Sequence, residues 1–577
     1  MLNLISVAIE GADRRGVQRA VESARRQGFL SATSLEWEGG SLTGWSHPSE
    51  QETENCEVCS HAGVACCVGP IWYRGRFGRS ALLLILEDTD ANGCVDEACV
   101  RGNHALFIRT RDRCMLMNDA LGFVRVYVSA DRCFYSTSWL ATCAYTGGVE
   151  LDEAASIEYV LLGASHSDSS VARGVTTLPL GYAFDLSKKN TQGRLAGDPW
   201  GGETSPASLG GAVEEISAYL KTASRELAAA FPGRVRAALS GGFDSRLIVA
   251  GLLACGSRPE LFVYGAPESV DVTIAGAVAA GVGLPVQHVD KQAMDRDLPF
   301  PDLERLVDSA LFFDGLPNDG VHDPGPDQQT RLAQTAGSRI ALNGGGGEIF
   351  RNYFHLQDRP YHAVDVVRAF YRGFDGNAFR HRHGLRLYQE RMVSSIECCL
   401  GLAGADLNPK LTRGQVELLY PLFRCHFWMG VNNSVGVRHG YYMTPLVDLN
   451  TIRLAWSLPL RWKNAGLLES HIIAKLHTEL ASQPSSYGFR FTERPTWDAR
   501  FSEWATRMRP VRVRPYINAW HRRFGKSGVP AEMALRCRAL LPGEWRLDQI
   551  LDLNRLPSSE AFARALAIEV VWRELVA

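Results

Sequence analysis

Residues 235–250, with the sequence VRAALSGGFDSRLIVA, decide how this chain folds. The apolar run Val235–Leu239 is typical of a buried strand, and a helical pattern follows it near Ser245–Ala254. The turn Ser240–Ser245 between them holds two adjacent glycines, which let a backbone approach an anion closely. The amides of such a turn and the positive end of the next helix point at that anion. The sequence therefore predicts a phosphate-binding loop where a strand meets a helix.

The side chains of this loop add to the predicted nucleotide site. Ser240 and Ser245 offer hydroxyl donors, and Asp244 offers a carboxylate for Mg²⁺. The loop is not a Walker A motif, because it has no G-x4-G-K-[ST] pattern. A glycine-rich turn with a Ser or Asp helix cap is the structural alternative, which the further strand–helix units after the loop disfavour. The loop residues assigned to nucleotide binding are Leu239, Ser240, Gly241, Gly242, Asp244 and Ser245.

Strands and helices alternate on both sides of this loop. The predicted segments are helix Ala212–Ala230 before the loop and, after it, strand Leu261–Tyr264, helix Val272–Gly281, strand Val286–Val289 and strand Ile340–Leu342. Such alternation predicts a doubly wound parallel sheet with helices on both faces. From about Val364 onward the pattern is mostly helical.

The first 200 residues follow a different, strand-rich pattern. Their short apolar runs, separated by Gly, Asp and Asn, are Ala81–Leu86, His104–Ile108, Cys114–Met117 and Val124–Val128. The segment Gly193–Gly211 is rich in Gly, Ser and Pro and is the expected linker. We therefore expect two domains, residues 1–200 and residues 212–577.

Composition and charge exclude several classes of protein. The 577 residues are 46% hydrophobic and 21% charged, which excludes global disorder. The 61 Lys and Arg nearly balance the 63 Asp and Glu, so binding of nucleic acid over the whole surface is disfavoured, although a local basic patch stays open. No apolar run approaches the roughly 18 residues of a membrane span, and Met1–Glu10 lacks the features of a signal peptide. We expect a cytoplasmic protein without a membrane partner.

The chain contains fourteen cysteines. In a cytosolic chain thiols stay reduced, so no disulfide framework is expected. The densest group, which could ligate zinc, consists of Cys56, Cys59, Cys66 and Cys67, with His61 between them. A strong zinc site has two C-x2-C pairs, whereas here Cys56 and Cys59 have that spacing and Cys66 and Cys67 are adjacent. We therefore favour buried strand thiols for Cys66 and Cys67.

The loop Ser240–Ser245 resembles the SGGxDS pyrophosphate loop of the ATP pyrophosphatase superfamily, whose members cleave ATP between the α and β phosphates. Over most of its length the chain is similar to the asparagine-synthetase-like amidotransferases of that superfamily. The matching segments are, in order, Leu116–Gly122 with Val126-Tyr127, Tyr135–Ser138, Gly174–Gly181, Asn343–Phe350 and Pro445–Asp448. The resemblance implies a degenerate Ntn-type αββα domain, followed by a doubly wound ATP-pyrophosphatase synthetase domain with a helical C-terminal part.

One departure from the family concerns the source of the amine. Glutamine-dependent members carry a cysteine nucleophile at residue 2, where this chain has Leu2, so we expect no glutamine hydrolysis. Members of this kind, the β-lactam synthetases and the lasso-peptide macrolactam cyclases, use an amine already present on the substrate or a partner. The stretch Gly344–Phe354 followed by Asp358–Tyr361 is most similar to the lasso cyclases.

The resemblance implies a ligase that uses ATP and Mg²⁺. A substrate carboxylate attacks the α-phosphorus and releases pyrophosphate, and an amine of the same molecule then displaces AMP to form an amide. A ribosomal peptide closed to a macrolactam is the expected substrate, with a precursor-peptide protease or leader-binding protein as a candidate partner. Three alternatives stay open: amidation of a small acid or sugar acid with ammonia, modification of tRNA, and nucleotide binding without catalysis.

A further departure concerns the metal ligands. The resemblance places Gly347 at a metal-binding Asp and Gly344 at an acidic or tyrosyl position. Glu348 is then the candidate second Mg²⁺ ligand, and the alternative is a surface glutamate that opens a helix. Gly345 and Gly346 would let the backbone bend towards the phosphates, so both are assigned to the nucleotide site.

The family's K-x-G-F lysine, which the resemblance implies in adenylation, falls near Tyr487–Phe489, where no lysine stands. The candidate replacements are Arg490, Lys463 and Lys475, and each has the alternative of a solvated surface cation. Together with Glu348 and Tyr487, they complete the set of candidate catalytic residues.

The segment Arg500–Lys526 is basic, with eight Lys or Arg against one acid, Glu503. Its interleaved aromatic residues are Phe501, Trp504, Tyr516, Trp520 and Phe524. Basic and flat aromatic side chains together suit RNA or an acidic peptide. We favour a solvated helical face whose aromatic side chains pack inward, and a functional role would be contact with a peptide substrate or a partner protein.

Overall fold

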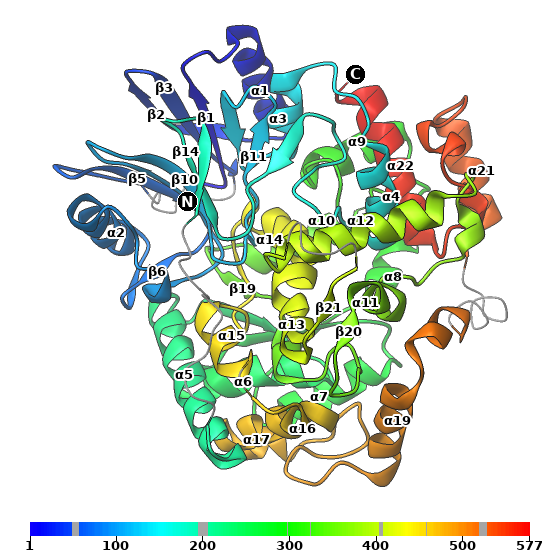
Figure 1. Ribbon diagram of the computed structural model, residues 1–577. Coiled ribbons are helices and arrows are strands. Elements are labelled where there is room, and N and C mark those ends of the chain that lie inside the picture. Colours follow the sequence, from blue (N-terminus) through cyan, green and yellow to red (C-terminus); the bar gives the residue numbers. More distant parts are fainter. Residues whose placement is uncertain are drawn as a thin grey trace.

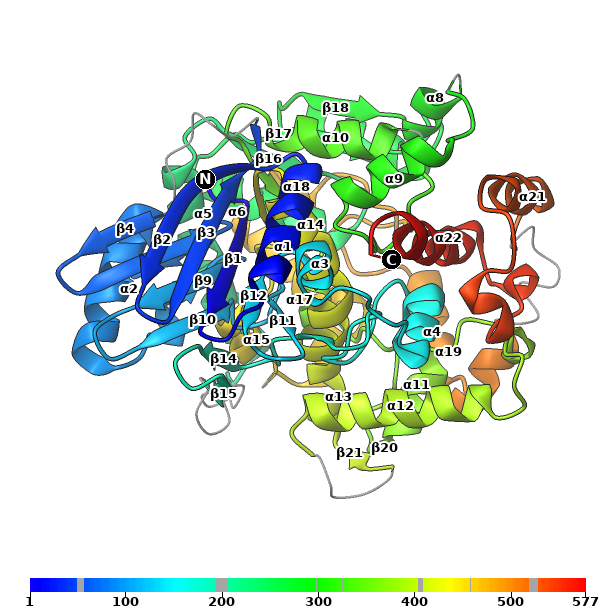
Figure 2. The ribbon, with the colours of Figure 1, turned by 90° about the horizontal axis from the view of Figure 1, so that it is seen from above.

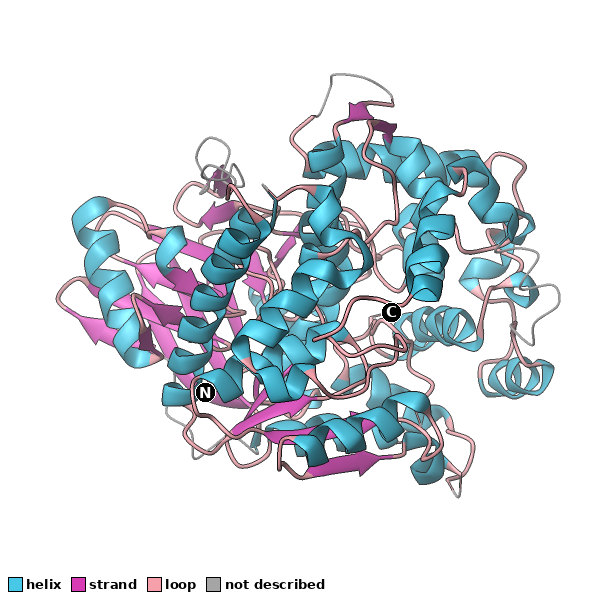
Figure 3. Ribbon diagram, turned by 90° about the horizontal axis from the view of Figure 1, so that it is seen from below, coloured by secondary structure: helices cyan, strands magenta, loops and turns pink. Residues whose placement is uncertain are grey.

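The structure is a computed structural model that describes residues 1–48, 57–193, 206–296, 298–323, 325–402, 408–456, 458–517 and 528–576. It is a mixed α/β molecule, in which strands gather on one side and helices make up most of the other (Figure 3). None of the helices in these ranges is long and apolar enough to span a membrane.

Two six-stranded antiparallel sheets form the N-terminal part. The first contains, in spatial order, β13 (Val175–Thr177), β11 (Tyr127–Ser129), β12 (Phe134–Ser136), β1 (Leu4–Ile9), β3 (Gly40–Ser46) and β2 (Leu30–Trp37). The second contains β15 (Asn190–Gly193), β14 (Tyr182–Asp185), β10 (Cys114–Asn118), β9 (Ala105–Arg109), β5 (Gly63–Val68) and β4 (Glu57–Ser60). Apolar side chains of both sheets, such as Val7 and Phe107, belong to one buried cluster, so the sheets pack face to face.

Helices cover the outer faces of these two sheets (Figure 1). Helices α1 (Arg14–Arg26) and α3 (Trp139–Thr146) pack on the first sheet, and α2 (Arg79–Asn92) packs on the second. The layers are therefore helix, sheet, sheet and helix. Cys66 and Cys67 are buried on β5, as we favoured, and face opposite sides of it. Cys59 is exposed, and Cys56 lies outside the described residues.

One predicted strand is wrong, because Ala81–Leu86 lies inside α2. Leu82 and Leu86, four residues apart, are buried against the second sheet, whereas Leu83 is 37% exposed. That spacing is helical. A short apolar run cannot distinguish a strand from a buried helix by its periodicity, and here the helix occurs.

A five-stranded parallel sheet forms the centre of the remaining chain. Its strands are, in spatial order, β18 (Val286–Val289), β17 (Glu260–Tyr264), β16 (Val235–Ala238), β19 (Ile340–Leu342) and β22 (Tyr441–Met443). Helix α6 (Phe243–Ala254) connects β16 to β17, and α7 (Val270–Gly281) connects β17 to β18. The predicted strands and helices of this unit are confirmed.

Both faces of this sheet are covered. Leu342 of β19 lines a small apolar cavity with Leu220 of α5 (Leu209–Ala230) and Leu247 of α6. Ala341, which points the other way, packs with the cluster between the N-terminal sheets. Helix α5 begins within the predicted linker, Gly193–Gly211, of which residues 194–205 lie outside the described ranges.

The rest of the chain is mostly helical, as predicted. The remaining helices are α4 (Glu153–Leu162), α8 (Lys291–Asp295), α9 (Leu303–Phe312), α10 (Pro326–Thr335), α11 (Ala363–Phe370), α12 (Gly384–Cys399), α13 (Arg413–Leu419), the π-helical stretch Tyr420–Met429, α14 (Gly430–Val437), α15 (Leu449–Trp456), α16 (Leu460–Lys463), α17 (Leu467–Leu476), α18 (Thr478–Ala481), α19 (Trp497–Met508), α21 (Ala531–Leu540) and α22 (Ser559–Glu574). Short strands form two further small sheets: β6 (Trp72–Tyr73), β7 (Arg76–Phe77) and β8 (Val100–Arg101), and β20 (Tyr361–His362) with β21 (Lys410–Leu411).

The basic segment differs from our expectation. Phe501, Trp504 and Tyr516 are 48%, 47% and 72% exposed, so the prediction that its aromatic side chains pack inward is wrong for these three residues. Helix α19, which carries Phe501 and Trp504, lies at the edge of the molecule and packs on the turn Asn464–Gly466 between α16 and α17 (Figure 1). Its charged side chains keep it in solvent, but its apolar face does not turn to the core. Residues 518–527, which include Trp520, Phe524 and three of the basic residues, lie outside the described ranges.

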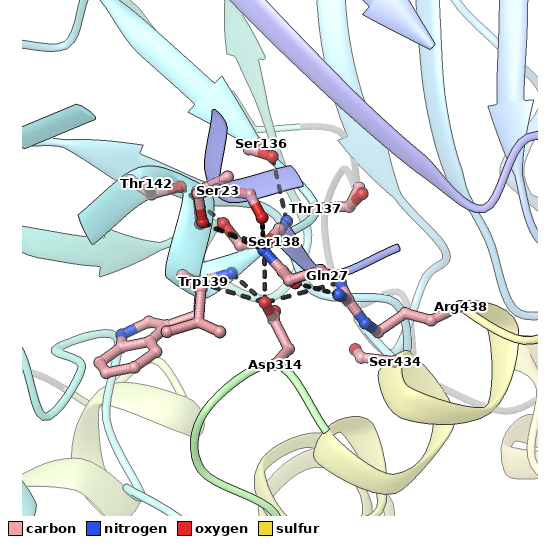
Figure 4. Close-up of polar contacts among 12 residues, drawn as sticks. Ser23, Gln27, Ser136, Thr137, Ser138, Trp139, Thr142, Asp314, Ser434 and Arg438 are labelled. Atoms are coloured by element: carbon pink, nitrogen blue, oxygen red, sulfur yellow. Dashed lines mark hydrogen bonds and ion pairs between the residues drawn. The ribbon is translucent and has the colours of Figure 1, made fainter. Parts of the chain in front are cut away.

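The N-terminal part and the parallel-sheet part share one interior. Asp314, which follows α9, reaches across to α3 (Figure 4): its carboxylate accepts from the Ser138 hydroxyl at 2.6 Å and from the Trp139 N–H at 2.7 Å. Arg438 approaches the same carboxylate at 3.6 Å. The last helix, α22, packs against α4 and α9, so the end of the chain returns to the N-terminal part (Figure 2).

Candidate active site

The predicted phosphate loop lies at the switch point of the parallel sheet. Ser240–Ser245 leaves the carboxyl end of β16, and α6 begins at once with Phe243. The strand order reverses here, because β17 and β19 flank β16 on opposite sides and the later strands extend outward from each. In doubly wound sheets, ligands bind outside the carboxyl ends of the strands at this point.

Hydrogen bonds fold the loop into one compact turn. The Ser240 N–H donates to Ser245 Oγ at 3.0 Å, and the two hydroxyl oxygens are also 3.0 Å apart. The Gly241 N–H donates to Asp271 Oδ1 at 3.0 Å, which ties the loop to the start of α7. A Cβ at Gly241 would lie 2.8 Å from Ser486 Cβ, so the position needs glycine. The buried Leu239 precedes the turn and extends the pairing with β17.

Three carboxylates meet at one guanidinium beside this loop. Arg351 Nη2 is 2.5 Å from Asp244 Oδ1 and 3.7 Å from Glu348 Oε1, and Arg351 Nε is 2.8 Å from Glu469 Oε2. Asp244 comes from the phosphate loop, Glu348 from the loop after β19 and Glu469 from α17. The loops after β16 and β19 therefore face each other at this edge of the sheet.

Burial and charge perturb these groups in different directions. Burial raises the pKa of Asp244 well above its ordinary value, and the nearby Arg351 only partly opposes the rise. Burial also raises the pKa of Glu469 to about 7. The pKa of Glu348 is lowered despite its burial, because Arg351 and hydrogen bonds from its neighbours, including Tyr420, favour the carboxylate. The carboxylate of Glu348 therefore stays ionised, whereas burial disfavours the ionised form of Asp244 beside it.

The glycines of the second loop make room for this cluster. A Cβ at Gly347 would lie 2.6 Å from Glu469 Oε1 and 2.7 Å from Asp244 Oδ1. At Gly346, φ is +103° and a Cβ would lie 2.4 Å from Val447, so glycine is required there as well. The Gly346 N–H donates to Glu348 Oε2 at 3.1 Å, and the Gly345 N–H donates to Asn343 Oδ1 at 3.1 Å.

The position of Glu348 agrees with parts of both alternatives that the sequence left open, and its role as a metal ligand stays a prediction. It belongs to a single 3₁₀ turn, Gly347–Phe350, so it does begin a short helix. Its side chain nevertheless points into the cluster, where the Tyr420 hydroxyl donates a hydrogen bond to it. Its orientation fits the predicted catalytic position.

The other candidate catalytic residues divide into one that lies at the site and three that do not touch the cluster. Tyr487 stacks on Phe243 with ring centroids 4.5 Å apart, and its hydroxyl accepts from Arg351 Nη1 at 3.3 Å. Within the described residues, the three predicted cations are placed elsewhere: Lys463 is buried and pairs with Glu417, Lys475 pairs with Glu214 at the surface, and Arg490 is exposed beside Glu493.

Sequence reasoning missed Arg351, Glu469 and Tyr420. Arg351 follows Glu348 by three residues, a spacing at which opposite charges meet on a helical turn, so the pair was visible. Glu469 was visible as a single acid inside the apolar run of α17, Leu467–Ile473, where an acid needs a buried partner. For Tyr420 the sequence carries no such signal.

The arrangement partly fits a divalent cation. Among the described residues, no group of three or more His, Cys, Asp or Glu is placed to hold a metal ion. Asp244, Glu348 and Glu469 nonetheless share a single guanidinium, so full ionisation leaves an excess of negative charge. Carboxylate oxygens are the ligands that Mg²⁺ prefers, and Asp244 and Glu348, whose side chains are 13% and 26% exposed, are more accessible than the fully buried Glu469.

Comparisons with known proteins give little further guidance. No family model matches the chain, and no curated protein matches it. Among solved structures, it is similar to the glutamine-dependent NAD+ synthetase from Acinetobacter baumannii in complex with adenosine diphosphate (ADP), with 18% identity and a TM-score of 0.17. The match covers 30% of this chain and 31% of that chain, less than a third of its length. A similarity at this level carries no conclusion about function.

Proposed function

We propose that this protein is an ATP-dependent ligase that adenylates a substrate carboxylate and converts it to an amide. The observation that carries the proposal is the loop Ser240–Ser245, which follows the switch-point strand β16 and meets the Asp244, Glu348, Glu469 and Arg351 cluster. Phosphate loops of this kind are found where a nucleotide binds.

The loop supplies the contacts that a triphosphate needs. The hydroxyls of Ser240 and Ser245 and the start of α6 are donors for phosphate oxygens. Asp244 and Glu348 would hold Mg²⁺, which neutralises phosphate charge when bound. Arg351, which lies between them and contacts Tyr487, is the cation that we assign to the role of the missing family lysine.

The proposed reaction has two steps. A carboxylate oxygen of the substrate attacks the α-phosphorus, the bond between the α-phosphorus and the bridging oxygen breaks, and pyrophosphate leaves. The nitrogen of an amine then attacks the acyl carbon, the acyl–phosphate bond breaks, AMP leaves and the amine loses a proton. The cation at Arg351 stabilises the charge that develops on the phosphoryl oxygens in the first step.

We further propose that carboxylate and amine belong to one peptide, so that the product is a macrolactam. Holding both ends of a chain in one site supplies effective molarity, which is the main help that a ring closure needs. Free ammonia acting on a small acid is the second candidate, because the cluster at Arg351 would serve either reaction.

A pyrophosphate-release assay tests the proposal. Purified protein is incubated with ATP and Mg²⁺ and, in separate reactions, with linear peptides that carry a free amine and an acidic side chain, with small acids plus ammonia, and with tRNA. We expect pyrophosphate and AMP in equal amounts, together with a product that, for a cyclised peptide, is lighter than the substrate by one water. Formation of ADP, or turnover with tRNA alone, would overturn the assignment.

A further inference from the structure

Helix α19 carries a stripe of large apolar side chains exposed to solvent. Trp497, Phe501, Trp504 and Met508 are 71%, 48%, 47% and 45% exposed. Their spacing of four, three and four residues places them on one helical face. The rings of Trp497 and Phe501 stack at 5.1 Å and 7°, and those of Phe501 and Trp504 at 5.7 Å and 29°. A continuous ridge of this kind marks a binding surface more often than a solvated one.

The rest of the molecule does little to stabilise this helix. Within the described chain, α19 buries none of its twelve residues. It packs on the turn Asn464–Gly466, Ala499 touches the main core cluster, and Arg514 donates a hydrogen bond to the Thr506 carbonyl. Isolated helices of about this length are marginal in water, and most helices in proteins are stabilised by packing of an apolar face. The exposed ridge is therefore the face that a bound molecule would cover.

A groove of about 570 Å³ runs between α19 and this turn. Arginines border it, namely Arg461, Arg494, Arg500 and Arg507, and one acid, Glu503, lies among them. Glu503 is already engaged, because its carboxylate lies 4.0 Å from Arg507 and accepts a hydrogen bond from the Ala465 backbone. The groove thus presents an excess of positive charge along an aromatic wall.

We propose that this groove binds a peptide segment that carries carboxylates and large apolar side chains. The excess of arginine is complementary to carboxylates, and guanidinium groups bind them in a bidentate geometry. The stacked rings of Trp497, Phe501 and Trp504 supply the apolar anchors of such an interface. The volume is in the range of pockets that enclose a few side chains.

The same features disfavour two other occupants. A nucleic acid carries a far denser negative charge than a peptide, and the chain as a whole, with a formal net charge of −2, has no overall attraction for such a polyanion. A membrane surface would need a convex apolar face, whereas the arginines here line a hollow.

The groove adjoins the candidate active site. Gly466, which lies between the lining residues Ala465 and Leu467, packs so closely on Phe243 that a Cβ would lie 2.3 Å from the ring. Leu467 lines the groove, and Glu469, two residues later, belongs to the carboxylate cluster. Arg514, after α19, donates to the Phe354 carbonyl at 3.0 Å and so ties this region to the segment that follows Arg351. A peptide in the groove therefore continues towards the phosphate loop. That this peptide is the substrate rests on the proposed function.

A selection experiment identifies what the groove binds without assuming a sequence. An mRNA-display library of random 15-residue peptides is selected against the full chain in the absence of ATP, and enriched peptides are measured by fluorescence anisotropy. We expect enrichment of Asp or Glu together with Leu, Ile, Phe or Trp. Affinity should fall at least tenfold in Phe501→Ser and in Arg500→Glu. Leu535→Ser, which removes another exposed apolar side chain on α21, should bind as the wild type does.

Three results would overturn the proposal: no enrichment, enrichment without acidic residues, or equal binding to the two groove variants and the wild type. A labelled (U)20 RNA and vesicles of phosphatidylcholine with phosphatidylserine are tested in parallel. Binding of either probe that is lost in Phe501→Ser, with no peptide bound, would assign the surface to that class of partner instead.

The design keeps this proposal separate from the proposed function. Asp244→Ala should bind the selected peptides as tightly as the wild type, because Asp244 is outside the groove. If peptides bind and no pyrophosphate is released with any carboxylate, the ligase assignment is wrong and the docking surface stands. If pyrophosphate is released and no peptide is selected, the docking surface is wrong and the ligase assignment stands.

Discussion

Arg351 is the residue on which the charge of the candidate site depends. Its guanidinium contacts Asp244 and Glu469 directly, and the cluster of three acids is otherwise buried with an excess of negative charge. Removing one partner of a buried ion pair leaves an uncompensated charge, which costs more than the pair contributes. Arg351 also donates a hydrogen bond to the Tyr487 hydroxyl, so one side chain links the loops after β16 and β19 to the segment after α18. The ion pairs give Arg351 a structural reason to be a cation, and the proposed reaction would add a catalytic one.

At the residue scale, Asp244→Ala should abolish pyrophosphate release while the fold is kept. The carboxylate would help to neutralise the phosphates, where metal assistance contributes several kcal/mol, so we expect a rate loss of roughly 10²-fold or more. Arg351 keeps its ion pair with Glu469, so the thermal unfolding temperature should change little. Both quantities are measured on the same preparation, and wild-type turnover would mean that the loop does not bind the nucleotide.

Glu348→Gln keeps the size and hydrogen bonding of the side chain but removes its charge. We expect a raised Mg²⁺ requirement and a rate loss of roughly 10²-fold, about 2.7 kcal/mol of transition-state stabilisation. Tyr420→Phe is the matched control, because it removes the hydrogen bond to Glu348 and leaves the carboxylate. Its effect should be smaller. A magnesium titration of the rate for both variants decides the matter, and an unchanged titration for Glu348→Gln would exclude the residue as a ligand.

The sequence identified the loop Ser240–Ser245 of this site but not the ion pair between Arg351 and Glu469. Ser240–Ser245 is a local pattern, in which neighbouring residues alone determine the turn, so its place between β16 and α6 was predictable from spacing. The ion pair between Arg351 and Glu469 joins segments that are more than 100 residues apart and meet where α17 packs on α6 and on the turn Gly347–Phe350. No local pattern encodes such a contact. For the same reason Lys463 was a plausible catalytic cation by position, although its charge is compensated by Glu417.

At the scale of the element, the loop after β19 depends on glycines, which leave space that the neighbouring carboxylates occupy. We expect Gly347→Ala to destabilise the protein by about 1–3 kcal/mol and to lower activity, because the new Cβ would overlap the carboxylates of Glu469 and Asp244. Gly373→Ala is the control, since a Cβ there meets no atom within 4 Å. Urea unfolding of both variants measures the difference, and equal stability would show that the cluster can move aside.

The elements themselves differ in how far the sequence predicts them. Parallel strands such as β16 and β17 are buried on both faces, so each is a short apolar run between helices, and their bounds follow from it. Helix α2 was missed because Leu83 and Leu84, which are not buried, fill the gap between the buried pairs Ala81-Leu82 and Ile85-Leu86, so the apolar run is unbroken in the sequence. Helix α19 was recognised as helical and basic, but amphipathicity does not say which face meets the protein.

At the scale of the whole molecule, neutral histidines occupy the boundary between the N-terminal part and the rest. His426 contacts the Leu121 carbonyl at 2.7 Å through Nδ1, and His166 packs its ring against Phe423 and Phe427. His439 stacks on Phe312 at 3.8 Å. Burial lowers the pKa of His166 and of His426 to about 3, and it lowers that of His439 well below the ordinary value. The two parts therefore meet in an environment that disfavours protonation.

The protein should consequently lose stability as the pH falls below about 6.5, the ordinary histidine value. Because the folded-state pKa of His426 is lowered, the unfolded chain binds the proton more readily, so stability is complete above that pH and declines below it. At pH 5.5 the protonation of this histidine in the unfolded chain should lower the free energy of unfolding by about 1.4 kcal/mol.

Other groups titrate in the same range, since burial raises the pKa of Asp119 and of Asp168 to about 6. The test is therefore a difference between proteins: urea unfolding at pH 7.5 and 5.5 for the wild type and for His426→Asn, which cannot be protonated. The loss between the two pH values should be about 1.4 kcal/mol smaller in His426→Asn, whereas the exposed His381→Asn should behave as the wild type does. An identical loss in all three proteins would show that His426 accepts a proton within the folded structure.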